Sequence, residues 1–122
     1  IQADGGTRTA AITGAWVALR IACEKMLLSG AITRQPMRDH VAAISCGVWQ
    51  GMPVADLDYA EDSTAEIDAN FVLSGDGGLV EIQATGEERP FRREELTRML
   101  DLAEAGCQHL FTLQADAVRA AM

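Results

Sequence analysis

Two glycines, a threonine and an arginine precede a long apolar run near the start of the chain, in the stretch QADGGTRTA. Glycine lets a backbone approach a ligand closely, and the first N–H groups of a helix are unpaired and carry the positive end of its dipole. With the hydroxyl of Thr7 and the forked guanidinium of Arg8, the motif Gly5-Gly6-Thr7-Arg8 could bind an anion such as phosphate. The alternative interpretation is that Thr7 only caps the helix and Arg8 is solvated.

An acidic segment in the middle of the chain is the second candidate for chemistry. Between residues 56 and 68 the chain places six carboxylates, at Asp56, Asp58, Glu61, Asp62, Glu66 and Asp68. If part of this segment is helical, Asp58, Asp62 and Glu66 share a face, where like charges repel. Such a cluster faces water, binds a cation, or keeps one carboxyl protonated for acid–base chemistry. Because apolar residues are interleaved with the acids, we expect Asp62 and Asp68 to be held in place.

The remaining polar candidates are weaker. His40 and His109 have no acidic or nucleophilic partner nearby in the sequence, so we expect structural or surface roles for both. Three arginines, Arg89, Arg92 and Arg93, gather where a helix is predicted to begin. We expect this basic cluster to be solvated or to touch a neighbouring subunit.

Composition limits the class of protein. The chain has 122 residues, 48% of them hydrophobic and 23% charged, which is typical of one globular domain or a part of one. No apolar run reaches the ~18 residues of a membrane span, and the first residues lack the features of a signal peptide. Three well-separated cysteines without a CxxC motif indicate reduced thiols in a cytoplasmic protein. The net charge of −8 argues against nucleic acid as a partner, although a local basic site can exist on an acidic protein.

Hydrophobic periodicity predicts the elements that position these residues. We expect a helix over 7–28, hairpins of strands at 41–49 with 52–59 and at 70–74 with 79–85, a helix over 92–105 that ends at Gly106, and a further helical tail. The helix over 7–28 is apolar nearly all round, so we expect cover on two sides. This order predicts an α+β fold in which an antiparallel or mixed sheet packs on helices. Because the chain opens on Ile1 in what reads as the end of a strand, we expect it to be a piece of a longer protein.

Three long stretches resemble the C-terminal half of the ribonuclease PH family. They are IQADGGTRTAAITGAWVAL, PVADLDYAEDSTAEIDANFVLSGDGGLVEIQATGE and PFRREELTRMLDLAEAGCQHLFTLQ, and with their order kept they cover nearly all of the chain. The resemblance implies a fold of the ribosomal protein S5 domain 2 type, with a mixed sheet, of which residues 1–122 are an incomplete C-terminal portion. It also implies a homo-oligomer, a hexameric ring built as a trimer of dimers.

The resemblance further implies a phosphorolytic 3′→5′ exoribonuclease that trims tRNA precursors and takes part in rRNA processing. Such an enzyme transfers nucleotides to inorganic phosphate and releases nucleoside diphosphates. Gly6, Thr7 and Arg8 are then expected to bind phosphate, and Asp62 and Asp68 to be the catalytic carboxylates, with Mg²⁺ nearby.

The family's N-terminal half, with a further arginine and a basic RNA-contacting region, is not in the sequence. We therefore expect these 122 residues to be inactive on RNA when alone. A non-catalytic scaffold or RNA-binding subunit of an exosome-like ring is the alternative function, and a small-molecule phosphate-binding domain is a third.

Overall fold

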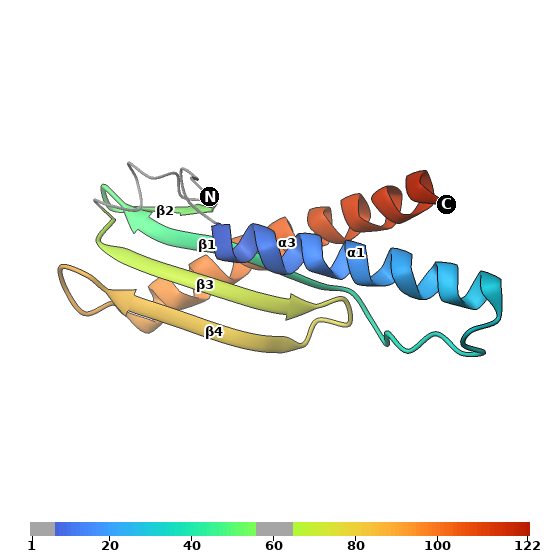
Figure 1. The fold of residues 1–122 in the computed structure, drawn as a ribbon. Helices are drawn as coiled ribbons and strands as arrows, with labels where there is room; N and C mark the ends of the chain where they lie inside the picture. The colour runs from blue at the N-terminus through green and yellow to red at the C-terminus, as the bar shows by residue number, and fades with distance from the viewer. Residues whose placement is uncertain (1–6, 56–64) are drawn as a thin grey trace.

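The computed structural model describes residues 7–55 and 65–122 and contains two long helices and four strands (Figure 1). In chain order these are α1 (Thr7–Ser29), β1 (Val41–Trp49), β2 (Met52–Ala55), β3 (Ile67–Ser74), β4 (Leu79–Gly86) and α3 (Arg93–Ala121). The predicted α+β class is confirmed. Within these residues, neither helix is long and apolar enough to cross a membrane.

The four strands form one sheet in the order β2-β1-β3-β4. All three pairings are antiparallel, so this part of the sheet is not mixed. The β1–β2 connection is the predicted two-residue hairpin, in which Gln50 and Gly51 both have positive φ, 52° and 77°. The second predicted hairpin, β3–β4, is also confirmed.

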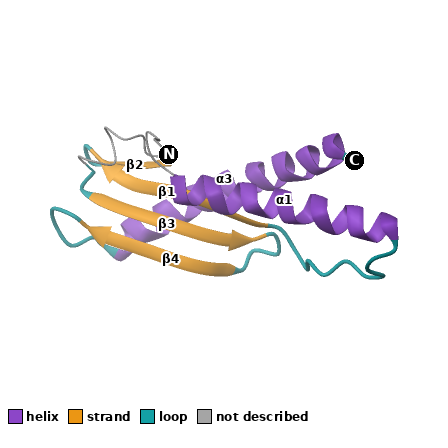
Figure 2. Ribbon diagram, viewed as in Figure 1, coloured by secondary structure: helices purple, strands orange, loops and turns teal. Residues whose placement is uncertain are grey.

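The hydrophobic core lies between α3 and one face of the sheet, which α3 crosses behind the strands in Figure 2. Along β1 and β3, every second side chain points toward α3 because strand side chains alternate between faces. On the helix, the buried side chains recur at every third or fourth residue, from Met99 to Gln114, and so form one stripe. The core cluster consists of Ala42, Ile44, Cys46, Val48, Ile67, Ala69, Phe71, Leu73, Met99, Ala103, Cys107 and Phe111.

Helix α1 runs along β1 and also contacts α3. The Thr13 hydroxyl accepts a hydrogen bond from the Ala43 amide (3.1 Å) and lies 3.4 Å from the Ala43 carbonyl oxygen, to which it donates. These bonds occupy the edge of β1 beyond the point where β2 ends. Only Thr9 and Trp16 of α1 are buried, so the described residues do not provide the cover on two sides that its apolar sequence led us to expect.

Two predicted boundaries are wrong, both because of tertiary packing. Gly106 does not end a helix: α3 continues through it to Ala121. A Cβ at Gly106 would lie 2.3 Å from Cδ1 of Ile44, so this glycine allows helix and sheet to pack closely. Strand β3 begins at Ile67 rather than at residue 70, because Ile67 and Ala69 continue its buried alternation. Asp68 therefore lies in a strand and not in a separate acidic segment.

Candidate functional site

The sheet face that points away from α3, here called the polar face, contains Asp68. Strand register aligns side chains into rows across this face. Asp68 lies in one row with Gly47 of β1 and Thr85 of β4. The next row contains Ser45, Asn70 and Gln83, and the one after it contains Ala43, Val72 and Glu81. Because Gly47 has no side chain, no β1 side chain stands beside the Asp68 carboxylate in its row.

Arg8 reaches the polar face from the first turn of α1. Its guanidinium forms an ion pair of 2.5 Å with Glu81, and the two side chains are 49% and 42% exposed. Along β3, the row of Glu81 lies four residues from Asp68, which is about 13 Å at the strand rise of ~3.3 Å per residue. The structure therefore brings Arg8 and Asp68 to the same face, with Arg8 directed to a neighbouring part of it.

The other predicted site residues divide between the described and undescribed parts of the chain. Thr7 is the first residue of α1 and is exposed. Gly6 and Asp62 lie outside the described residues, as does most of the acidic segment. The hypothesis that Asp58, Asp62 and Glu66 share a helical face falls on the same segment.

Oxygen donors on the polar face fit a hard cation. The Asn70 side chain lies on the same face as Asp68, and the buried Ser45 hydroxyl opposite Asn70 has no hydrogen-bond partner within the described chain. Mg²⁺ is bound through one or two carboxylates and keeps several of its waters. Over residues 7–55 and 65–122, no group of three acidic, histidine or cysteine side chains could hold a metal by itself. Asp68 would thus supply one carboxylate.

His40 has a structural role, as predicted, in the contact between α1 and α3. Its ring stacks on Trp16 with centroids 4.1 Å apart, and Nδ1 lies 3.0 Å from Oε1 of Gln114. The Gln114 amide nitrogen donates to the carbonyls of Thr13 (3.1 Å) and Val41 (2.9 Å). Since both amide hydrogens are used, Oε1 must accept, and His40 must carry its proton on Nδ1. His109 is exposed.

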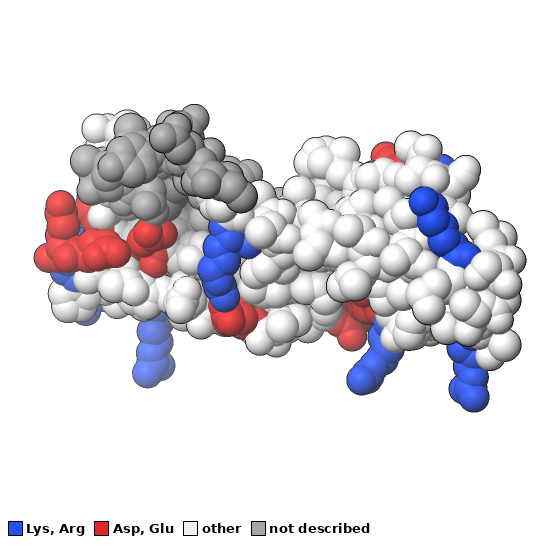
Figure 3. All heavy atoms as spheres, viewed as in Figure 1, with Lys and Arg blue, Asp and Glu red and all other residues white. Residues whose placement is uncertain are grey.

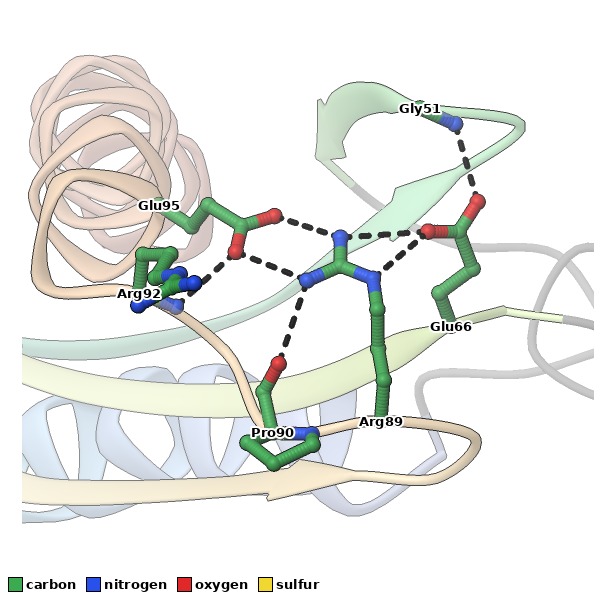
Figure 4. Close-up of polar contacts among 6 residues, drawn as sticks. All are labelled: Gly51, Glu66, Arg89, Pro90, Arg92 and Glu95. Atoms are coloured by element: carbon green, nitrogen blue, oxygen red, sulfur yellow. Dashed lines mark hydrogen bonds and ion pairs between the residues drawn. The ribbon is translucent and has the colours of Figure 1, made fainter.

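The expectation that Arg89 is solvated is met only in part, because its side chain is 39% exposed but is also held by two carboxylates. Its guanidinium lies between Glu66 and Glu95, which come from the start of β3 and the first turn of α3 (Figure 4). The sequence offered one local signal, since Glu95 stands three residues after Arg92, the spacing of a capping box. The Glu95 carboxylate indeed accepts from the Arg92 amide at 2.9 Å. The partnership of Arg89 with Glu66 had no sequence signal.

Comparisons with known proteins identify the family of the chain. Residues 39–106 match the sequence profile of a family described as the 3′ exoribonuclease family, domain 2. The chain is 60% identical, over 97% of its length, to a ribonuclease PH from Methylobacterium radiotolerans, and 59% identical to a ribonuclease PH from Caulobacter vibrioides over the same share. It spans about half the length of these curated relatives, 50% in each case.

Solved structures show the same fold at low sequence identity. The crystal structure of rice Rrp46 aligns with a TM-score of 0.75 and 19% identity, covering 98% of this chain and 51% of that one. An Archaeoglobus fulgidus exosome chain, from a structure with RNA bound to the active site, aligns with a TM-score of 0.53 and 17% identity over 62% of this chain and 30% of that one. At these identities the likeness shows the fold alone.

Proposed function

Since the chain belongs to the 3′ exoribonuclease family through its domain 2, we propose that the protein containing it shortens RNA from the 3′ end by phosphorolysis. Inorganic phosphate is the attacking group, and each cycle releases a nucleoside diphosphate. The substrates that we propose are tRNA precursors, by analogy with relatives named ribonuclease PH. The observation that carries the proposal is that Arg8 and Asp68, which the sequence singled out for different chemical reasons, lie on one polar face.

The residues at the start of α1 bind the attacking phosphate. Backbone N–H groups at a helix N-terminus attract anions, and a guanidinium can donate to two phosphate oxygens at once. Gly6, Thr7 and Arg8 would form this site. Because Arg8 is paired with Glu81 in the structure, phosphate must take the place of that carboxylate or share Arg8 with it.

Asp68 and Asp62 act at the bond that breaks. An oxygen of phosphate forms a new bond to the terminal phosphorus of the RNA, while the bond from that phosphorus to the 3′-oxygen of the preceding nucleotide breaks. The leaving 3′-oxygen then needs a proton or a positive charge. A carboxylic acid at Asp62 or Asp68 can supply the proton. Alternatively, these carboxylates and the neighbouring Asn70 hold Mg²⁺, which when bound neutralises charge that develops on oxygen.

RNA binding requires more than this part of the molecule. On the face drawn in Figure 3, the Lys and Arg side chains of the described residues stand singly, with uncharged and acidic surface between them. The net charge of −8 adds a long-range repulsion of RNA. We therefore propose that residues 1–122 are the C-terminal part of a larger domain, and that the RNA path and a further phosphate-binding arginine come from the N-terminal half. A homo-hexamer is the proposed assembly.

The test uses the full-length protein that contains this segment. A tRNA precursor with a 3′ extension is incubated with and without inorganic phosphate, and nucleoside diphosphates are measured. Asp68→Asn keeps the size of the side chain and removes its charge, so we expect a rate loss of roughly 10²-fold, with RNA affinity little changed. Asp101→Asn, an exposed change on α3, is the matched control. RNA binding without phosphate-dependent shortening by the wild-type protein would instead favour a non-catalytic subunit.

A further inference from the structure

An arginine between two glutamates joins three separate elements next to Asp68 (Figure 4). The Nη1 and Nη2 atoms of Arg89 donate to the two oxygens of Glu95 at 2.9 and 2.7 Å. Its Nε and Nη2 atoms both lie 3.1 Å from Oε2 of Glu66, and Nη1 also donates to the Pro90 carbonyl at 3.1 Å. Every guanidinium nitrogen is thus engaged. We call this set, Glu66, Arg89 and Glu95, the Arg89 bridge.

Glu66 is fixed at more points than its ion pair. Its second carboxylate oxygen accepts from the Gly51 amide in the β1–β2 turn at 3.0 Å. Its own amide donates to the Val48 carbonyl, and its carbonyl accepts from the Glu87 amide, both at 2.9 Å. Glu66 is therefore tied to the β1–β2 turn, the end of β1, and the turn that follows β4.

Asp68 lies at the end of the sheet that this anchoring holds. The last pair of the β3–β4 ladder is Ile67 with Gly86, and Asp68 with Thr85 is the pair before it. Terminal pairs of a ladder open most readily because few contacts oppose their separation. The next residue outward is Glu66, whose bonds continue the pairing beyond the ladder. The Arg89 bridge thus holds the start of β3 through Glu66, two residues from Asp68, the proposed catalytic carboxylate.

The charges and the donor geometry of the Arg89 bridge suit a structural role. The hydrogen bonds that Arg89 donates to Glu95 and then to Glu66 raise the pKa of Arg89, and the bonds that Glu95 accepts from Arg89 and the Arg92 amide lower the pKa of Glu95 to about 2. Arg89 and Glu95 therefore stay charged over the range in which enzymes work. A lysine would keep the positive charge but could replace the arginine only in part, because an ammonium cannot present donors to both carboxylates in one plane.

We propose that Arg89 is a positioning residue for the phosphorolytic reaction, which holds the start of β3 through Glu66 so that the Asp68 carboxylate keeps its place on the polar face. The inference rests on the proposed function. It assigns Arg89 no contact with phosphate or RNA. A displacement of about 1 Å in a reacting group can cost up to ~10²-fold in rate. Loss of the bridge should thus lower kcat and leave the Michaelis constants for phosphate and RNA nearly unchanged.

The experiment compares Arg89→Met and Arg89→Lys with Arg119→Met in the full-length protein. Arg119 makes an exposed ion pair with Asp116 at the far end of α3, which makes it a matched control. We expect kcat to fall about 10-fold in Arg89→Met, with both Michaelis constants within about twofold of wild type. Arg89→Lys should recover part of the rate because it keeps the charge without the fork. Amide hydrogen exchange over residues 65–70 should increase most in Arg89→Met and less in Arg89→Lys. Arg119→Met should match wild type in every measurement.

Three results would overturn the inference. The first is unchanged exchange over 65–70 in Arg89→Met, since the bridge would then not hold the strand. The second is increased exchange with an unchanged kcat, and the third is a loss of activity that appears in the Michaelis constants and not in kcat. If the wild-type protein shows no phosphate-dependent activity, the proposed function fails, and with it the catalytic role of Arg89. The exchange data then decide separately whether the bridge orders β3. Glu66→Gln, which loses the charge but keeps the shape, repeats the exchange test without placing two carboxylates side by side.

Discussion

The start of α1 and the turn before α3 each place an arginine beside acidic side chains, and they hold it differently. Among the described residues, Arg8 has one carboxylate partner, Glu81, and about half of its side chain is exposed. Arg89 lies between Glu66 and Glu95, with its remaining donor on the Pro90 carbonyl. A single exposed ion pair contributes little to stability and exchanges readily for another anion. Every nitrogen of Arg89 is engaged, so it has no donor to offer a ligand.

The two arginines are therefore held in different ways. Arg8 forms one exposed pair near the polar face, and we propose that phosphate displaces Glu81 from it. Arg89 is fixed between Glu66 and Glu95, and we propose that it keeps the start of β3 in place. The four predictions below test whether the two arginines differ in this way, from the largest expected effect to the smallest.

Gly86→Ala should damage the turn that carries Arg89. A Cβ at Gly86 would lie 2.0 Å from the Arg89 carbonyl oxygen, a backbone atom that cannot move without the turn. We expect a loss of about 1–3 kcal/mol in the free energy of unfolding, as for other overpacked sites. Gly14→Ala on α1 is the control, because its Cβ would meet nothing within 4 Å. That change should stabilise the helix by about 0.5–1 kcal/mol. Urea unfolding of the Gly86→Ala and Gly14→Ala variants measures both changes. Equal unfolding midpoints for the two variants would contradict the prediction.

Arg8→Lys should change phosphate use and leave stability intact. An ammonium lacks the planar fork that fits two phosphate oxygens. We expect the phosphate concentration at half-maximal rate to rise about 10-fold, the equivalent of ~1.4 kcal/mol. The urea midpoint should stay at the wild-type value, since Arg8 is exposed. Titration of the phosphorolysis rate with phosphate is the measurement. An unchanged titration curve would sink the assignment of Arg8 to phosphate.

Glu81→Gln should act in the opposite direction. With its carboxylate partner neutralised, Arg8 no longer has to leave an ion pair when phosphate binds. Exposed pairs contribute at most ~1 kcal/mol, so the phosphate concentration at half-maximal rate should fall by no more than about fivefold. The same titration detects it. The double variant Arg8→Lys/Glu81→Gln gives the coupling free energy between the two residues. If the effects of the two single changes simply add, Glu81 does not compete with phosphate for Arg8.

The smallest expected effect is a pH-dependent change in stability. The folded pKa of Glu95 is about 2, below the ordinary value of 4.5, because Arg89 and the Arg92 amide favour its charged form. A depressed carboxyl pKa stabilises the folded state above pH 4.5, and this contribution is lost as the pH falls from 4.5 to 2. Glu95→Gln should therefore be less stable than wild type at pH 7, and the difference should narrow by pH 3. Since Arg89 is 39% exposed, solvent screens the pair and limits the difference. A gap that widens in acid would contradict the assignment.

Much of the fold followed from local sequence patterns. The spacing of apolar residues predicted α1, β1 and both hairpins, because burial along one element repeats with the period of that element. The turn at Gln50-Gly51 was predicted because two residues between two strand-like runs is the spacing of a tight hairpin. The same local logic failed at Gly106, where the reason for the glycine lies on another element, at Ile44 of β1.

The candidate site divides in the same way. The sequence by itself determined that the start of α1 can attract an anion and that Asp68 is set among apolar residues, because both depend on near neighbours in the chain. Only the tertiary structure decided that Arg8 pairs with Glu81, 73 residues away, and that Arg89 pairs with Glu66, 23 residues away. Strand register and helix placement determine such pairs, because they bring residues that are distant in the sequence next to one another. No local period in the sequence carries that information, because a one-residue shift in register would turn Asp68 from the polar face into the core.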